Sequence, residues 1–220
     1  MEKKARGWDY FLLALIVFGG LGMEVVYMSF LEPKLLGYSA NSSEWTTGQH
    51  IFHWVLTCMT WGLISWYAIR DAKKSCGFDV FVERQKLQKW QWTAIFVCIA
   101  AALVSSYISW DGCKVIKEFE SRGFLLFVFQ YIYYAFETVL FLLIIVFGQK
   151  AFEVWFKREN IPYGGIVCGL TWGFAHAFTK GSLLMGITGI FMGFLLGAAY
   201  LFAGRDIRKT YLILLIMFMF

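Results

Sequence analysis

Long apolar runs alternate with short charged gaps along the whole chain, and this alternation constrains the fold more than any other feature. A helix needs about 20 apolar residues to cross a hydrocarbon core of about 30 Å. Most of the runs meet or approach that length, whereas the fifth is short and the last has only ten residues. The sequence therefore predicts an all-α fold, a polytopic transmembrane bundle of six full spans and a short seventh C-terminal segment. The runs are residues 10–31, 51–69, 92–110, 123–148, 164–178, 182–202 and 211–220.

Basic residues are distributed unequally between the gaps. Fifteen of the 20 Lys and Arg residues fall in gaps on one side of the alternating map. Because cytoplasmic loops carry an excess of Lys and Arg, this asymmetry places the N-terminus in the cytoplasm. The majority side holds Lys3, Lys4, Arg6, Arg70, Lys73, Lys74, Arg84, Lys86, Lys89, Lys150, Lys157, Arg158, Arg205, Arg208 and Lys209; the other side holds Lys34, Lys114, Lys117, Arg122 and Lys180.

Composition excludes a soluble domain. The chain is 59% hydrophobic and 16% charged, which is not the profile of a soluble domain of this size. We expect one integral membrane domain over residues 1–220. The net charge of +5 is spread over four cytoplasmic edges, where anionic lipid headgroups attract it. Membrane lipids, and not nucleic acid, are the partners that this charge predicts.

Two glycine stripes predict close helix packing. Gly165, Gly169 and Gly173 recur every four residues in the fifth run, and residues 189, 193 and 197 repeat the pattern in the sixth. Small residues at this spacing let helix backbones approach closely in lipid. We expect the two stripes to pack on each other or on a common neighbour.

A few ionisable side chains fall inside the apolar runs, where each is costly and is functional by default. They are Glu24, His50, His53, Glu137 and His176. His176 lies on the same face as the first glycine stripe at about 100° per residue, so we expect it to point into the bundle. Glu137 has Gln130 on its face, seven residues earlier. The alternatives without function are a core histidine bonded to a backbone carbonyl for His176, a helix-to-helix hydrogen bond for Glu137 and an interfacial position for His50.

Depth brings Glu137 and His176 together. Glu137 lies eleven residues before the end of its run, and His176 lies thirteen residues after its own helix begins near Tyr163. At about 1.5 Å per residue, both lie roughly 16 to 20 Å from the cytoplasmic boundary. His53 and Glu24 enter from the opposite side, so we expect all four residues to converge at mid to outer depth.

This set of residues is compatible with two kinds of chemistry. Two carboxylates and two imidazoles can bind a divalent metal such as Zn²⁺. They can also act without metal, with a Glu activating water while a His stabilises an oxyanion. The sequence contains no HExxH motif, so a helix-borne zincin site is excluded. We therefore predict catalytic roles for Glu137 and His176, assisted by His53 and Glu24, and leave the metal open.

The segment from about residue 130 to 220 resembles the CPBP family of intramembrane proteases, which includes CAAX prenyl-protein endopeptidases and bacteriocin-processing or immunity proteins. The stretch Trp172-Gly-Phe-Ala-His176 is similar to the family's Phe-x-x-x-His motif, and residues 193–204 are similar to its glycine-rich helix. The resemblance implies an intramembrane glutamate- and histidine-dependent endopeptidase in a bacterial cytoplasmic membrane, with a membrane-associated peptide or protein as substrate.

The chain departs from the family pattern at two motifs. It has no Glu-Glu pair followed by Arg, and no His near residues 215–220, where a third motif is expected. Glu137 matches the first motif by depth. Another alignment places residues 148–153 on that motif and substitutes Gln149 for a glutamate.

Three functions follow from these residues. The first is a divergent CPBP-type peptidase. The second is a catalytically silent relative that binds a peptide, lipid or membrane partner in the same cavity. The third is a small proton- or ion-coupled carrier, which also uses buried Glu and His, although no broken helix pair is evident in the sequence.

Overall fold

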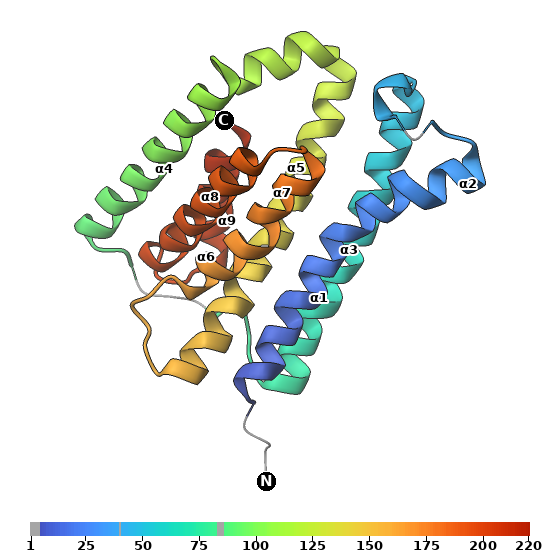
Figure 1. Ribbon diagram of the computed structural model, residues 1–220. Coiled ribbons are helices and arrows are strands. Elements are labelled where there is room, and N and C mark those ends of the chain that lie inside the picture. Colours follow the sequence, from blue (N-terminus) through green and yellow to red (C-terminus); the bar gives the residue numbers. More distant parts are fainter. Residues whose placement is uncertain (1–4, 40, 83–85) are drawn as a thin grey trace.

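The structure, a computed structural model, describes residues 5–39, 41–82 and 86–220 (Figure 1). Over these ranges every regular element is helical, and no strand occurs. The all-helical class expected from the sequence is therefore confirmed. Lys3, Lys4 and Arg84, which belong to the predicted charge asymmetry, lie outside the described residues.

The first helix runs further than its apolar run suggested. α1 (Gly7–Val26) passes through a π-helical turn (Tyr27–Leu31) directly into α2 (Glu32–Leu36). Pro33 sits in the first turn of α2, directly after the π turn. The helix ends at Gly37, whose φ of 68° suits a glycine cap. Glu32 is thereby carried into the bundle instead of a loop.

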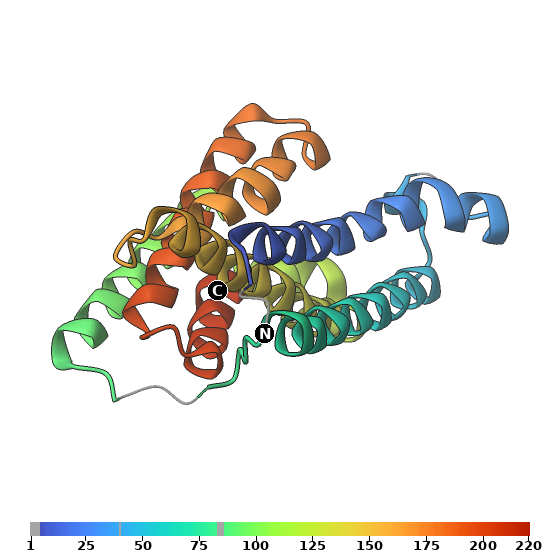
Figure 2. The ribbon, with the colours of Figure 1, turned by 90° about the horizontal axis from the view of Figure 1, so that it is seen from below.

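α1 packs along the next long helix. A 3₁₀ turn (Ser42–Glu44) precedes α3 (Thr47–Cys76), which starts with a capping box between Thr46 and Gln49. The indole N–H of Trp61 on α3 donates to the carbonyl of Gly20 on α1 at 2.9 Å. Figures 1 and 2 show these two helices side by side at one flank of the molecule. α4 (Lys89–Trp110) lies at the opposite flank.

The centre of the bundle is α5 (Lys114–Phe156). Gly123 interrupts it with φ 71° and ψ 168°, a left-handed conformation that glycine adopts easily. The helix turns there, so its first part crosses the top of the molecule and its longer part descends through the middle (Figure 1). Residues 140–149 are all buried, since α1, α3, α6 and α9 surround this part of the helix.

The two glycine stripes pack on each other, as the sequence predicted. The first lies on α6 (Tyr163–Cys168), a π-helical turn (Gly169–Gly173) and α7 (Phe174–Thr179), and the second on α8 (Leu183–Phe202). A Cβ atom on Gly165 would lie 2.9 Å from the Cα atom of Gly197, and one on Gly169 would lie 2.8 Å from the carbonyl oxygen of Ile190. Only glycine permits so close an approach of backbones.

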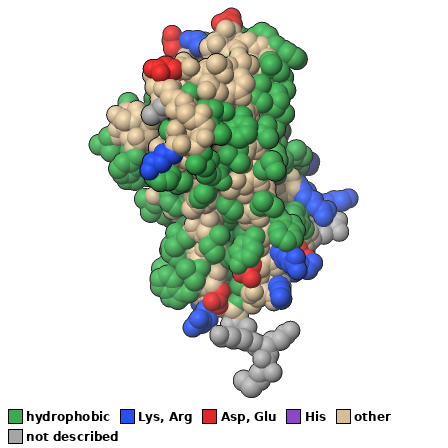
Figure 3. All heavy atoms as spheres, turned by 90° about the vertical axis from the view of Figure 1, so that its right-hand side faces the viewer, with side chains coloured by type: hydrophobic (Ala, Val, Ile, Leu, Met, Phe, Trp, Pro, Cys, Tyr) green, Lys and Arg blue, Asp and Glu red, His purple; other side chains and the backbone are tan. Residues whose placement is uncertain are grey.

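Among the residues that the structure describes, four helical segments are long and apolar enough to cross a membrane, namely Gly7–Leu36, Lys89–Trp110, Lys114–Phe156 and Leu183–Phe202. The expected count of six spans and a short seventh is not confirmed, although α9 (Ile207–Met219) is indeed short. Large apolar side chains remain exposed over the flanks, and most charged side chains visible in Figure 3 lie toward the two ends. This surface is compatible with a membrane protein.

Candidate functional site

The four side chains singled out from the sequence come from four elements: Glu24 from α1, His53 from α3, Glu137 from α5 and His176 from α7. They form two connected pairs. Glu137 and His176 both contact Trp172, and Glu24 and His53 face each other. Tyr133, four residues before Glu137 on α5, contacts Glu24 of the second pair.

Trp172 joins Glu137 to His176. Its indole N–H donates to Oε1 of Glu137 at 2.8 Å. The imidazole of His176 stands edge-on to the same indole, with ring centroids 4.9 Å apart, and Nδ1 of His176 lies 2.9 Å from the Trp172 carbonyl oxygen. Trp172 is buried, whereas the other two side chains are only partly buried. One aromatic residue thus holds the predicted base and the predicted imidazole on its two sides.

The Trp172 contact sets the tautomer of His176. A backbone carbonyl can only accept a hydrogen bond, so Nδ1 must carry the proton. In the neutral ring, Nε2 is then an acceptor. It can donate to an oxyanion only after protonation, which refines the role expected from the sequence.

His53 lies between two carboxylates. Its Nδ1 is 2.9 Å from both carboxylate oxygens of Glu32, and its Nε2 is 3.6 Å from Oε1 of Glu24. His53 and Glu32 are buried, and the Glu32 side chain is 0% exposed, against 29% for Glu24. Glu32 therefore positions the imidazole, while Glu24 is the carboxylate that retains access from outside.

Glu32 was missed in the sequence. It follows the end of the first apolar run and precedes a proline, and no role was predicted for it. The signal that would have found it is its spacing of eight residues from Glu24, which separates the two carboxylates by only about 80° around a regular helix. The π turn between them changes that angle.

Tyr133 joins Glu24 to α5. Its hydroxyl donates to Oε2 of Glu24 at 2.8 Å, and Glu137 follows it by one turn on α5. Glu24 is also near enough for its charge to act on both Glu137 and His176. We refer to Glu24, His53, Glu137 and His176, together with Tyr133 and Trp172, as the polar layer; these residues come from α1, α3, α5 and the segment of residues 163–179.

Gln130 does not accompany Glu137. Its amide donates to Oε1 of Glu118 at 3.0 Å and to the hydroxyl of Tyr134 at 2.6 Å. Tyr131 donates to the other oxygen of Glu118 at 3.0 Å. Glu118 is buried beneath the turn at Gly123, because that turn folds the start of α5 back toward its straight part.

Gln149 has a separate structural role at the other end of α5. Its carbonyl accepts from the Gly164 backbone N–H at 2.9 Å, and its amide donates to the Ile161 carbonyl and to Glu153. Arg205 also contacts Glu153, at 3.1 Å. This cluster closes the connection between α5 and α6, and it holds neither predicted histidine.

The metal-binding arrangement considered from the sequence is not assembled. Across the described residues, no group of three or more His, Cys, Asp or Glu side chains is placed to hold one ion. His53 already uses Nδ1 for Glu32, and His176 uses Nδ1 for a carbonyl. The four residues are instead arranged as two pairs: Nε2 of His53 lies 3.6 Å from Glu24, and Glu137 and His176 share contacts with Trp172.

Comparison with protein-family models, with curated proteins and with solved structures finds no match to this chain.

Proposed function

We propose that the protein is an intramembrane hydrolase that cleaves a membrane-associated peptide or protein, with Glu137 and His176 at the reacting atoms. The observation that carries this proposal is the shared contact with Trp172, which orients a carboxylate and an imidazole from two helices. The similarity of residues 172–176 to the CPBP histidine motif adds to it. An orienting group beside a base is the usual arrangement in sites that activate a nucleophile.

In the proposed reaction, one oxygen of Glu137 is engaged by the indole N–H and the other accepts a proton from water. The water oxygen bonds to the carbonyl carbon of the scissile amide. Protonated His176 donates from Nε2 to the resulting oxyanion. The C–N bond then breaks, and the amine leaves with the proton held by Glu137.

Glu24 and His53 assist from the facing helices. Tyr133 and His53 hold Glu24 at the edge of the same layer. We infer that Glu24 binds the amine side of the substrate, since it is the partly exposed carboxylate of the set. Its carboxylate also stabilises the positive charge that His176 acquires.

The proposed topology has six spans, a short seventh segment and a cytoplasmic N-terminus. α3 contains 30 residues, about 45 Å of helix, and therefore exceeds the hydrocarbon thickness despite its polar ends. Residues 163–179 give about 25 Å, somewhat less than a full span. α9 has 13 residues and covers about 20 Å. The molecule would sit in a bacterial cytoplasmic membrane.

A proton-coupled carrier is the second candidate. No broken helix pair is evident in the sequence, which disfavours a carrier. In the structure, however, helices contain π turns at Tyr27–Leu31 and Gly169–Gly173. Both lie beside the polar layer, and π turns are frequent at functional sites. The buried pair of Glu32 and His53 would then carry the proton.

The test is incorporation of ¹⁸O. The reconstituted protein is incubated in H₂¹⁸O with membrane-spanning and lipid-anchored peptides, and new carboxyl termini are sought by mass spectrometry. We expect labelled products from the parent and from Glu120→Gln, an exposed carboxylate on α5, but none from Glu137→Gln or His176→Ala. Cleavage by all four would contradict the assigned roles. No cleavage by the parent would favour a silent binding protein, or the carrier if liposomes holding it conduct protons.

A further inference from the structure

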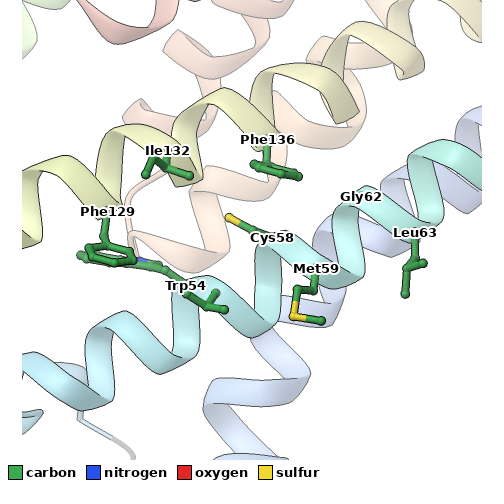
Figure 4. A pocket seen from close by; sticks show the side chains of 9 residues that line it. Trp54, Cys58, Met59, Gly62, Leu63, Phe129, Ile132 and Phe136 are labelled. Atoms are coloured by element: carbon green, nitrogen blue, oxygen red, sulfur yellow. The ribbon is translucent and has the colours of Figure 1, made fainter.

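An apolar groove lies between α3 and α5, outside the polar layer (Figure 4). Its volume is about 420 Å³. Trp54 and Cys58 on α3 form its buried floor, whereas Met59 and Ile132 form an exposed rim. The groove is therefore open along its length to whatever surrounds the helices.

Gly62 keeps the groove open at one end, where it faces Phe136. A Cβ atom there would lie 3.4 Å from the ring of Phe136 on the facing helix. This is an ordinary van der Waals contact, so alanine would fit and any longer side chain would enter the groove. The space exists because residue 62 has no side chain.

A cation without a protein partner lies above the other end. Arg122 is exposed and forms no ion pair or hydrogen bond with any described residue. It is close enough for its charge to act on His50, whose ring lies against the Trp54 ring with centroids 5.5 Å apart. Arg122 directly precedes Gly123, where the straight part of α5 begins, and Phe129 of the groove lies about 9 Å of helix rise beyond Gly123.

We propose that this groove is a binding site for one glycerophospholipid, with an acyl chain between α3 and α5 and the phosphate on Arg122. The apolar groove suits the hydrocarbon chain of a lipid. The unpaired guanidinium of Arg122 suits the anionic phosphodiester of the same lipid. Arginine binds phosphate through two parallel N–H donors. The glycerol backbone spans the distance between the two parts. The site depends on the membrane placement of the bundle and not on hydrolysis.

The test is native mass spectrometry of the delipidated protein with phosphatidylcholine or with diacylglycerol of the same acyl chains. We expect the parent to retain phosphatidylcholine. It should bind diacylglycerol at least about tenfold more weakly, because diacylglycerol has no phosphate to form a charge-assisted contact with Arg122. Arg122→Gln should weaken phosphatidylcholine to the same degree, and its control is Arg158→Gln, an exposed arginine at the other end of α5.

Filling the groove tests the chain site separately. Gly62→Leu should weaken both lipids at least about tenfold, because the new side chain occupies the channel. Gly22→Leu is the control, since nothing lies within 4 Å of a Cβ atom at Gly22. Should Gly62→Leu fail to fold, Ile132→Trp fills the same groove from its exposed rim. Equal binding of the two lipids, or binding unchanged by Arg122→Gln or by the groove variants, would overturn the proposal.

Discussion

The indole N–H of Trp172 donates to the carboxylate of Glu137 across a helix interface, at 2.8 Å. These residues are 35 positions apart in the chain, and Trp172 lies in the π turn that precedes α7. The bond therefore aligns α5 with the segment that carries His176. It also restricts the rotamer of Glu137.

Replacing Trp172 by Phe should separate orientation from packing. Phenylalanine keeps an aromatic ring against Phe141 and His176 but has no N–H donor. We expect cleavage to fall at least tenfold, whereas stability should fall by only about 0.5–2 kcal/mol, the usual worth of a hydrogen bond between membrane helices. Peptide cleavage and thermal unfolding in detergent measure the two effects. Equal activity in both proteins would show that the bond does not orient Glu137.

Replacing Glu32 by Gln should destabilise the outer half of the bundle. The carboxylate is fully buried, and both of its oxygens contact His53. Removing one partner of a buried pair typically costs about 3–5 kcal/mol. We expect a clearly lower midpoint of thermal unfolding, whereas the exposed Glu120→Gln should unfold like the parent. An unchanged midpoint for Glu32→Gln would mean that His53 does not depend on this carboxylate.

Substitution in the glycine stripes should disrupt the pairing of residues 163–179 with α8. A side chain at Gly193 would collide with the backbone of Gly169, and one at Gly169 with that of Ile190. Gly193→Leu and Gly169→Leu should each lose several kcal/mol, as overpacked sites do, about 1–3 or more. Gly22→Leu has open space and serves as the control. If the stripe variants melt like the parent, the helices do not pack along these glycines.

The lowered pKa of Asp206 predicts a small loss of folding stability at acid pH. Burial alone would raise its pKa, but hydrogen bonds from the side chain and backbone of Lys209 and from the Arg208 backbone outweigh burial and hold the pKa below its ordinary value. The stabilisation of the fold by ionised Asp206 is therefore fully present above the pKa of the unfolded chain, near 3.9. It is lost as pH falls through the lower pKa of the folded protein. Between about pH 5 and 2, the parent should lose up to about 1 kcal/mol more than Asp206→Asn. Parallel curves for the two proteins would contradict this assignment.

Cysteine accessibility tests the membrane placement. Cys113 is exposed and Cys76 is half-buried, whereas the remaining three cysteines are buried. α4 lies between the two accessible positions in the chain. A membrane-impermeant maleimide should label Cys76 only from the cytoplasmic side and Cys113 only from the opposite side. Labelling of both from one side would remove α4 as a span and invalidate the orientation.

The sequence predicted those features that depend on regular helical spacing. Gly165, Gly169 and Gly173 meet the second stripe because a four-residue period survives in both helices. Residue counts at a constant helix rise predict that Glu137 and His176 lie at similar depth. In the structure Glu137 contacts Trp172, four residues before His176. Both predictions use one helix parameter and need no knowledge of neighbouring side chains.

The missed features arise where that regularity fails. The π turn before Glu32 and the bend at Gly123 are tertiary outcomes, so helical periodicity gave no signal for Glu32 or Glu118. Gln130 shares a helical face with Glu137, yet it bonds to Glu118, which the bend brings back over α5. The choice among polar partners thus depends on the bend, which single-sequence patterns do not specify.

An experimental structure in a lipid nanodisc would test the shared site most directly, through the distance between the Glu137 carboxylate and Nε2 of His176. We predict that both groups face one water molecule beside Trp172, at a separation that this water can bridge. A separation of more than about 10 Å, beyond the reach of one bridging water, would contradict the shared site and the hydrolase built on it.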